Sequence, residues 1–132
     1  MHILITIHPF TLLAVKLQNN DDFEVGKRHE VNCTVYTMNH TNVNISWIGP
    51  NGIITNENSN RIIVIPTTSN GSIHTSTLQF SYVSEEDENT SCNCTASLSG
   101  GHGSLSKSFT MSNLTSKLNY YHTHCMKAGK TC

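Results

Sequence analysis

Residues 30–36 read Glu-Val-Asn-Cys-Thr-Val-Tyr, a strict alternation of polar and apolar side chains. Successive side chains of a β-strand point to opposite faces, so this spacing places Val31, Cys33 and Val35 together on one face. The pattern is typical of a strand with one face in a core and the other in water. No segment shows the i, i+3, i+4, i+7 apolar spacing of an amphipathic helix, so strands organise this chain.

Similar alternating runs lie on both sides of this stretch. Toward the N-terminus, a first strand would carry Thr11, Leu13, Val15 and Leu17 on one face. Toward the C-terminus, the predicted strands and their inward residues are 43–47 (Val43, Ile45, Trp47), 53–54, 61–66, 76–80 (Leu78, Phe80), 92–98 (Cys92, Cys94, Ala96, Leu98) and 105–111 (Leu105, Phe109, Met111, with Lys107 as the exception).

Turn residues separate these runs. Pro50-Asn51-Gly52 predicts a type I′ hairpin turn, because Asn-Gly tolerates positive φ angles, and Asn70-Gly71 predicts a second hairpin. The acidic stretch Glu85–Glu88 is a solvated connection, and 100–103 turns the chain before the last strand. Seven or eight short strands with a turn every 8–12 residues or so indicate an all-β, antiparallel two-sheet sandwich.

Composition and charge exclude several classes of function. Charged residues make up only 13% of the chain and the net charge is −1, so no basic field attracts nucleic acid or an anionic membrane. No apolar run reaches the 18–20 residues or so that a membrane helix needs, and direct membrane insertion is not expected. The chain is instead rich in small polar residues, with 15 Asn, 15 Ser and 16 Thr.

Cysteines and glycosylation sequons point to an extracellular setting. The five cysteines are Cys33, Cys92, Cys94, Cys125 and Cys132, and an odd count leaves one thiol free or available for an intermolecular disulfide. Seven Asn-x-Ser/Thr sequons begin at Asn32, Asn39, Asn44, Asn70, Asn89, Asn93 and Asn113. Cysteines within strands and abundant sequons together favour a secreted or cell-surface protein.

The order of these features resembles an immunoglobulin-like domain of the I-set or V-set type. Trp47 follows Cys33 by fourteen positions and Cys94 follows it by sixty-one, which is similar to the Cys…Trp…Cys arrangement of the family. Residues 76–80 followed by 85–87 resemble strand E and the acidic E–F turn, and 61–64 resemble strand D. The resemblance covers residues 11–112 and implies a Greek-key sandwich of a metazoan cell-surface or secreted protein.

The resemblance implies a disulfide between Cys33 and Cys94, with Trp47 in the core against it beside Leu78 and Phe80. Such a bridge encloses about 60 residues and would stabilise the fold by about 4 kcal/mol. Cys92 remains an alternative partner, because at period two both thiols point inward.

Two positions depart from the family pattern. Cys92 occupies the position of the family's corner tyrosine, and Thr90 that of a glycine or alanine. Both changes predict a less firmly held E–F turn.

The chain divides into three expected parts. Residues 1–10 are an N-terminal extension or the remnant of a signal segment, since 3–15 are apolar but lack a preceding basic residue. Residues 11–115 form the domain, and 116–132 are a tail without a strand pattern. The tail histidines and cysteines have no framework to hold them, so no metal site is predicted.

No constellation of nucleophile, base and acid is recognisable, so neither enzymatic activity nor a cofactor is expected. The resemblance implies an extracellular recognition or adhesion module of a receptor-like protein, which binds an unidentified protein or glycan. A secreted immune-type binder and a structural spacer are the alternatives. Glycans are expected at Asn39, Asn44, Asn70, Asn89 and Asn113, whereas disulfide closure competes at Asn32 and Asn93, which precede Cys33 and Cys94.

The expected ligand contacts are in two loops. These are the B–C loop (Met38, Asn39, His40, Thr41, Asn42) and the F–G turn (Gly100, Gly101, His102, Gly103). The outward residues of strands C, F and G include neither an aromatic nor a charged side chain, so this face lacks the usual anchors of a protein interface. They are Asn44, Ser46, Asn93, Thr95, Ser97, Ser104, Ser106 and Ser108.

Overall fold

The computed structural model describes residues 12–38, 42–57, 59–98 and 103–114 of the 132-residue chain. These residues form eight strands and one short 3₁₀ turn. In chain order the elements are β1 (Leu12–Gln18), β2 (His29–Thr37), β3 (Val43–Gly49), β4 (Gly52–Ile53), β5 (Ile62–Asn70), β6 (Ile73–Phe80), η1 (Glu85–Asp87), β7 (Ser91–Leu98) and β8 (Ser104–Thr110).

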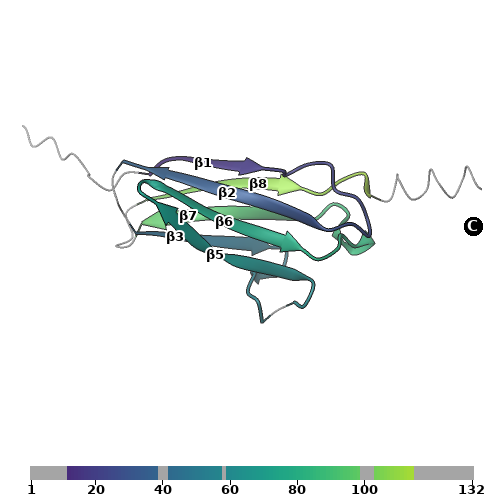
Figure 1. The fold of residues 1–132 in the computed structure, drawn as a ribbon. Coiled ribbons are helices and arrows are strands. Elements are labelled where there is room, and N and C mark those ends of the chain that lie inside the picture. Colours follow the sequence, from purple (N-terminus) through teal and green to yellow (C-terminus); the bar gives the residue numbers. More distant parts are fainter. Residues whose placement is uncertain (1–11, 39–41, 58, 99–102, 115–132) are drawn as a thin grey trace, which may run out of the picture.

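The strands make two facing layers, which Figure 1 shows one behind the other. Sheet I has the order β1-β2-β6-β5 and sheet II the order β4-β3-β7-β8, and all pairings in both sheets are antiparallel. The connections β2–β3 and β6–β7 cross from one layer to the other, as in a Greek key. The predicted all-β sandwich is confirmed.

The core lies between the sheets and is supplied by the inward residues of the central strands. Val31, Cys33 and Val35 of β2 are fully buried, as the alternation of residues 30–36 predicts. Trp47, Leu78 and Phe80 are also buried, so their predicted core positions are confirmed. The remaining inward residues of β6 and β7 are likewise buried: His74, Ser76, Cys92, Cys94, Ala96 and Leu98.

The edge strands depart from the predicted alternation. The pairing of β1 with β2 shifts between Leu12 and Ala14, and Leu13 at this irregularity is 57% exposed rather than inward. On β8, Leu105 is exposed as well, although Phe109 and Met111 are buried as expected. Period-two burial fails at these positions because an edge strand has a neighbour on one side only.

The turn between β3 and β4 is not the type I′ turn expected from Asn51-Gly52. Gly49 pairs with Gly52, so the two loop residues are Pro50 and Asn51. A type I′ turn needs positive φ at both loop residues, and the proline ring fixes φ near −65°. The positive φ of 106° falls on Gly52 instead.

A loop residue completes the core at the end of the sandwich near η1. Phe23, between β1 and β2, is buried and stacks on Phe109 with ring centroids 5.6 Å apart. It also meets Phe80 edge-on at 6.0 Å. The loop is held by a parallel bridge of Val25 with Val83. Phe23 therefore joins both sheets and the loop in one aromatic cluster.

Candidate functional site

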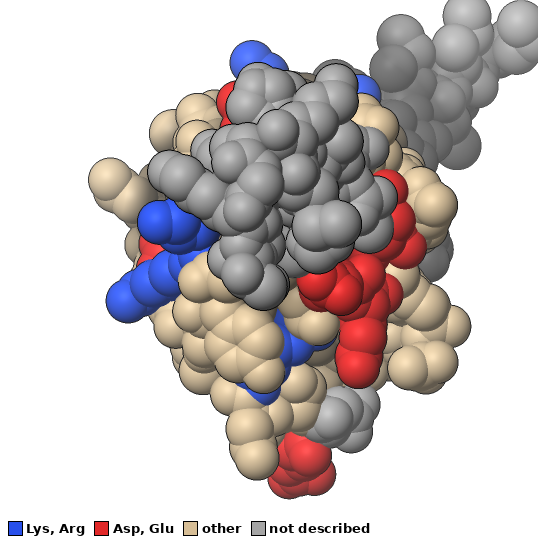
Figure 2. All heavy atoms as spheres, turned by 90° about the vertical axis from the view of Figure 1, so that its right-hand side faces the viewer, with Lys and Arg blue, Asp and Glu red and all other residues tan. Residues whose placement is uncertain are grey.

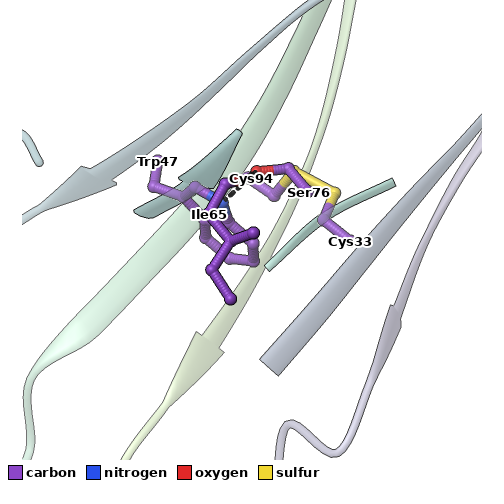
Figure 3. The surroundings of a disulfide bond; sticks show 5 residues. All are labelled: Cys33, Trp47, Ile65, Ser76 and Cys94. Carbon is purple, nitrogen blue, oxygen red and sulfur yellow. Dashed lines mark hydrogen bonds between the residues drawn. A yellow bond between two sulfur atoms is a disulfide. The ribbon is translucent and has the colours of Figure 1, made fainter. Parts of the chain in front are cut away.

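The disulfide at the centre of the domain joins Cys33 of β2 to Cys94 of β7 (Figure 3). Both cysteines are fully buried, and their Cα atoms are 6.5 Å apart. The pairing implied by the family resemblance is confirmed, and the alternative through Cys92 is wrong. The bond links sheet I to sheet II across the core, so it restrains the two layers against each other.

Trp47 packs beside this bond and takes part in a buried hydrogen-bond chain (Figure 3). Its indole Nε1 donates to Ser76 Oγ at 3.0 Å, and Ser76 Oγ donates to the carbonyl of Ile65 at 3.3 Å. The chain therefore crosses from β3 in sheet II to β6 and β5 in sheet I. Because Ser76 Oγ both accepts and donates a hydrogen bond, its hydroxyl is satisfied although it is buried. This explains how the core accommodates a serine at this position. The alternation placed Ser76 inward, but nothing in the sequence signalled its partner.

Cys92 is the free cysteine among the described residues, and it is 3% exposed. Burial, and then the charge of Asp87, raise the pKa of its thiol to about 11. A thiol with this pKa is protonated at neutral pH and is a poor nucleophile. Cys92 is thus free in the described part of the chain, and the other two unpaired cysteines, Cys125 and Cys132, lie outside it.

The acidic turn (Glu85–Glu88) is held by two interlocking contacts. Arg61, just before β5, donates two hydrogen bonds of 2.8 Å to the two carboxylate oxygens of Asp87. Ser84 caps η1 by accepting from Glu86 N, and its own N–H donates to Asp87 at 2.9 Å. The bidentate geometry and the low exposure of both partners make this pair stronger than a surface ion pair. These contacts substitute for the missing corner tyrosine.

The same turn takes the left-handed conformation at Asn89 (φ 61°) rather than at Thr90, the position usually occupied by glycine or alanine. Asn89 N donates to Met111 O at 2.6 Å, and Glu88 accepts from the backbone N–H groups of Asn113 and Leu114. The turn thus anchors the end of the described domain. Figure 2 looks at this end, where acidic side chains gather on one side of the visible surface.

A cavity of about 320 Å³ lies between the β3–β4 turn, the start of β5 and the acidic turn. Its apolar lining comes from Ile54, Ile62, Phe80, Cys92 and Met111, and the Arg61–Asp87 pair borders it. Cys92 is a small side chain at a position where the family has a tyrosine.

His74 of β6 is a second buried polar group with both ring nitrogens engaged. Its Nδ1 lies 2.7 Å from Ser69 Oγ and its Nε2 lies 3.3 Å from Thr37 Oγ1. Desolvation by burial lowers the pKa of His74 below its ordinary 6.5, so the ring is neutral at pH 7. His74 fastens the β5–β6 hairpin to the end of β2 and is not part of a catalytic group.

The outer face of sheet II consists of the alternate residues of its strands that point away from the core. Of the eight outward residues expected on β3, β7 and β8, three are half-buried (Ser46, Thr95, Ser97) and the others are exposed. The register adds an apolar pair that the sequence analysis did not include, Ile48 opposite Ile53, of which Ile53 is 62% exposed. The face is therefore hydroxyl-rich with one apolar end.

The outer face of sheet I has a different character. Tyr36 lies opposite Ile73, and the ammonium of Lys16 is 5.6 Å from the centre of the Tyr36 ring. Ile65 and Ile73 are among the exposed large apolar residues. Aromatic and charged side chains thus occur on this face, whereas the outer face of sheet II has only the apolar pair Ile48 and Ile53 among its hydroxyl residues.

The described sequons occupy distinct environments. Asn44 and Asn93 are exposed on sheet II, and Asn70 is exposed at the end of β5. Asn89 and Asn113 are exposed with positive φ. Asn32 is half-buried on sheet I, and its Oδ1 accepts a hydrogen bond from Thr77 at 2.7 Å. Asn39 lies outside the described residues.

The two expected ligand-contact loops are only partly described. Met38 is 51% exposed, Asn42 is exposed, and Gly103 has a φ of 87°. Residues 39–41 and 99–102 lie outside the described residues. Because Val43 pairs with Leu98, both loops leave from the same end of sheet II.

Within the described ranges, no group of three His, Cys, Asp or Glu residues is placed to hold a metal ion. No helix in this part of the chain is long and apolar enough to cross a membrane.

Solved structures share this architecture at low sequence identity, whereas no protein-family model and no curated protein sequence matches the chain. The fourth constant immunoglobulin domain of nurse shark IgNAR aligns over 78% of this chain and 96% of its own, with a TM-score of 0.51 and 15% identity. Rst D1-D2 aligns over 76% of this chain and 48% of its own, with a TM-score of 0.56 and 17% identity.

The full ectodomain (Ig1-Ig3) of mouse nectin-like molecule 4 aligns over 79% of this chain and 33% of its own, with a TM-score of 0.50 and 18% identity. The chain thus spans about half of the Rst fragment and a third of the nectin-like ectodomain. Two antiparallel four-stranded sheets joined by a buried disulfide, together with the likeness to these solved structures, show that the chain has an immunoglobulin-like fold.

Proposed function

We propose that this chain is an extracellular recognition or adhesion module, one domain of a receptor-like cell-surface protein. The observation that carries the proposal is the buried Cys33–Cys94 bridge. Such disulfides form and persist in oxidising compartments and are rare in the cytosol. The sequons on exposed strand and turn positions support the same setting.

The matched structures support a place within a multidomain ectodomain. The nectin-like protein presents three immunoglobulin domains in its full ectodomain, and this chain corresponds in length to one of them. An immunoglobulin-like domain hosts many functions, so the assignment to recognition is an inference from the fold. The B–C loop and the F–G turn are the proposed contact region, because loops on a rigid sandwich commonly carry binding residues.

Two alternative functions are a secreted soluble binder and a spacer domain without a ligand. Expression of the full-length protein with an epitope tag in animal cells distinguishes the secreted binder from the receptor. Tag staining on intact, non-permeabilised cells supports the receptor, tag only in the medium supports the secreted binder, and tag confined to the cytosol overturns the extracellular placement.

The spacer alternative needs a binding measurement. Cells that display the full-length protein are mixed with unmodified cells, and adhesion is scored for the unmutated protein, Met38→Arg and the control Ser106→Arg. Met38 is in the proposed contact loop, whereas Ser106 is on β8. Adhesion that is lost in Met38→Arg and kept in Ser106→Arg supports loop-mediated recognition. Equal adhesion in all three contradicts it.

A further inference from the structure

Two of the seven sequons lie on the same outer face of sheet II. One consists of residues 44–46 on β3 and the other of residues 93–95 on β7, and the two strands are antiparallel neighbours. In their register Ser46 lies directly opposite Thr95, so the hydroxyl residues that complete the two sequons share the centre of the face. The two asparagines stand four residues apart along the sheet, about 14 Å at 3.4 Å per residue.

Folding alone does not explain an asparagine at these two positions. Asn is depleted in strands, yet Asn44 and Asn93 both lie within strands and are exposed. Within the described part of the chain, neither side chain has a hydrogen-bond partner. By contrast, Asn32 is half-buried and accepts a hydrogen bond from Thr77. The amides of Asn44 and Asn93 are therefore available for modification.

The surroundings of both amides suit a carbohydrate. Asn44 lies opposite the half-buried Ser97, and Asn93 lies between Ile48 on β3 and the exposed Ser108 on β8. Ser46 and Thr95, both half-buried, lie between the two asparagines. A glycan over this surface meets no charge, and the apolar pair Ile48 and Ile53 lies only at the end of the face beside Asn93. Glycans at N-x-[ST] sequons are bulky and solubilising, so two of them would cover most of the face.

Resting on the extracellular setting proposed above, we propose that Asn44 and Asn93 are paired N-glycosylation sites whose glycans cover the outer face of sheet II. At each site the amide nitrogen forms a bond to C1 of a lipid-diphosphate-linked oligosaccharide. The bond from C1 to the lipid diphosphate breaks, the lipid diphosphate leaves, and the amide loses one proton. The step involves no oxidation or reduction.

The two sites differ in their relation to the disulfide. Asn44 is synthesised well before Cys94, so its sequon is complete before the Cys33–Cys94 bridge can form. Asn93 directly precedes Cys94, the middle residue of its sequon. The bridge holds Cys94 in the core between the two sheets, on β7, which pairs with β3 and β8. Modification of Asn93 must therefore precede disulfide closure, and Asn93 is expected to be occupied in fewer molecules than Asn44.

The test uses the 132-residue chain secreted from animal cells behind a heterologous signal sequence. Enzymatic removal of the glycans in ¹⁸O-water converts each modified asparagine to a labelled aspartate, which peptide mass spectrometry locates. Asn44→Gln and Ser46→Ala should each remove one glycan mass, while Asn56→Gln, an exposed asparagine outside any sequon, should remove none.

Label at Asn44 and at Asn93 supports the proposal. Absence of label at Asn44 while Asn70 is labelled overturns it and leaves the extracellular placement intact, because the signal sequence delivers every sequon to the transferase. Cytosolic residence of the native full-length protein would instead overturn the proposed function.

A second comparison tests the competition with the disulfide. Cys33→Ala removes the bridge and should raise the occupancy of Asn93 to that of Asn44. Trp47→Ala weakens the fold but keeps both cysteines, and it should leave Asn93 partly occupied. An equal rise in both variants would show that folding in general, and not the bridge, limits Asn93.

Discussion

Trp47 illustrates how one side chain combines core packing with a specific polar contact. Its ring is buried against the disulfide and edge-on to Phe109 at 6.5 Å, while its N–H donates to Ser76. Trp47→Ala should lower the free energy of unfolding by about 3–5 kcal/mol, as large core truncations do. Urea denaturation followed by circular dichroism measures this loss.

Trp47→Phe is the matched control for Trp47→Ala, because it keeps a six-membered aromatic ring and removes the pyrrole part of the indole with its N–H. Trp47→Phe should lower the free energy of unfolding by less than Trp47→Ala does, although Ser76 is then left without its hydrogen-bond donor. A loss below about 1 kcal/mol for Trp47→Ala would contradict its core role.

Cys92 is a residue whose small size has a structural consequence. The cavity of about 320 Å³ that it lines offers room for a larger apolar side chain. Cys92→Phe should raise the free energy of unfolding by about 1 kcal/mol, the usual gain of a cavity-filling substitution. Thermal unfolding of the domain with the Cys33–Cys94 bridge intact measures the change.

Cys92→Ser provides the control, since it removes the thiol without filling space and buries a hydroxyl instead. It should destabilise the domain. If Cys92→Phe destabilises the domain as much as Cys92→Ser, the cavity does not accept an aromatic ring.

At the scale of elements, predictability followed the position of a strand in its sheet. The central strands β2, β6 and β7 have a neighbour on both sides and one buried face, so their alternation was readable from the sequence. The alternation of the edge strands was not readable in the same way, because Leu13 lies at a shift in register and Leu105 lies on an edge strand.

Contacts between elements were harder still to predict. Phe23 lies in a loop without periodicity, and its stacking on Phe109 joins residues far apart in the sequence. The Arg61–Asp87 pair likewise depends on how the start of β5 meets the acidic turn, which no local pattern expresses. The Cys33–Cys94 pairing was accessible only through the family resemblance, since Cys92 and Cys94 share the inward period.

The β5–β6 hairpin makes stability depend on pH through His74. The folded state keeps this ring neutral with a lowered pKa, whereas the unfolded chain takes up a proton near pH 6.5. The stability that the neutral His74 ring contributes is complete above pH 6.5. It is lost as the pH falls from 6.5 through the lowered pKa of the folded state, because the unfolded state then binds more protons.

His74→Gln tests this dependence, because glutamine can keep hydrogen bonds to Ser69 and Thr37 without titrating. The free energy of unfolding, measured in urea at pH 7.5 and again at mildly acidic pH, should fall less in His74→Gln than in the unmutated domain. An identical fall would assign the acid sensitivity to other groups.

At the scale of the whole molecule, the two outer faces differ in what they offer a partner. Sheet I displays the aromatic Tyr36 beside Lys16 and the apolar Ile73, and aromatic residues are enriched at interfaces, whereas sheet II displays mainly hydroxyls. Its free edge strand β8 adds a further obstacle to association. Lys107 lies opposite the buried Cys94 and so points to the core side, yet it is exposed. A charge on the inward side of an edge strand discourages the pairing of that edge with another chain.

These features predict that the outer face of sheet II does not support a dimer of the antibody type, even when it carries no glycan. The enzymatically deglycosylated domain should sediment as a monomer at micromolar concentration, because the face offers no aromatic or charged anchor and its one apolar pair, Ile48 and Ile53, lies at one end. Ser46→Arg and Thr95→Arg, at the centre of the face, should leave this behaviour unchanged. A tight dimer that either substitution dissociates would show that this hydroxyl surface is an interface. The glycans at Asn44 and Asn93 would then regulate association, because their removal would expose it.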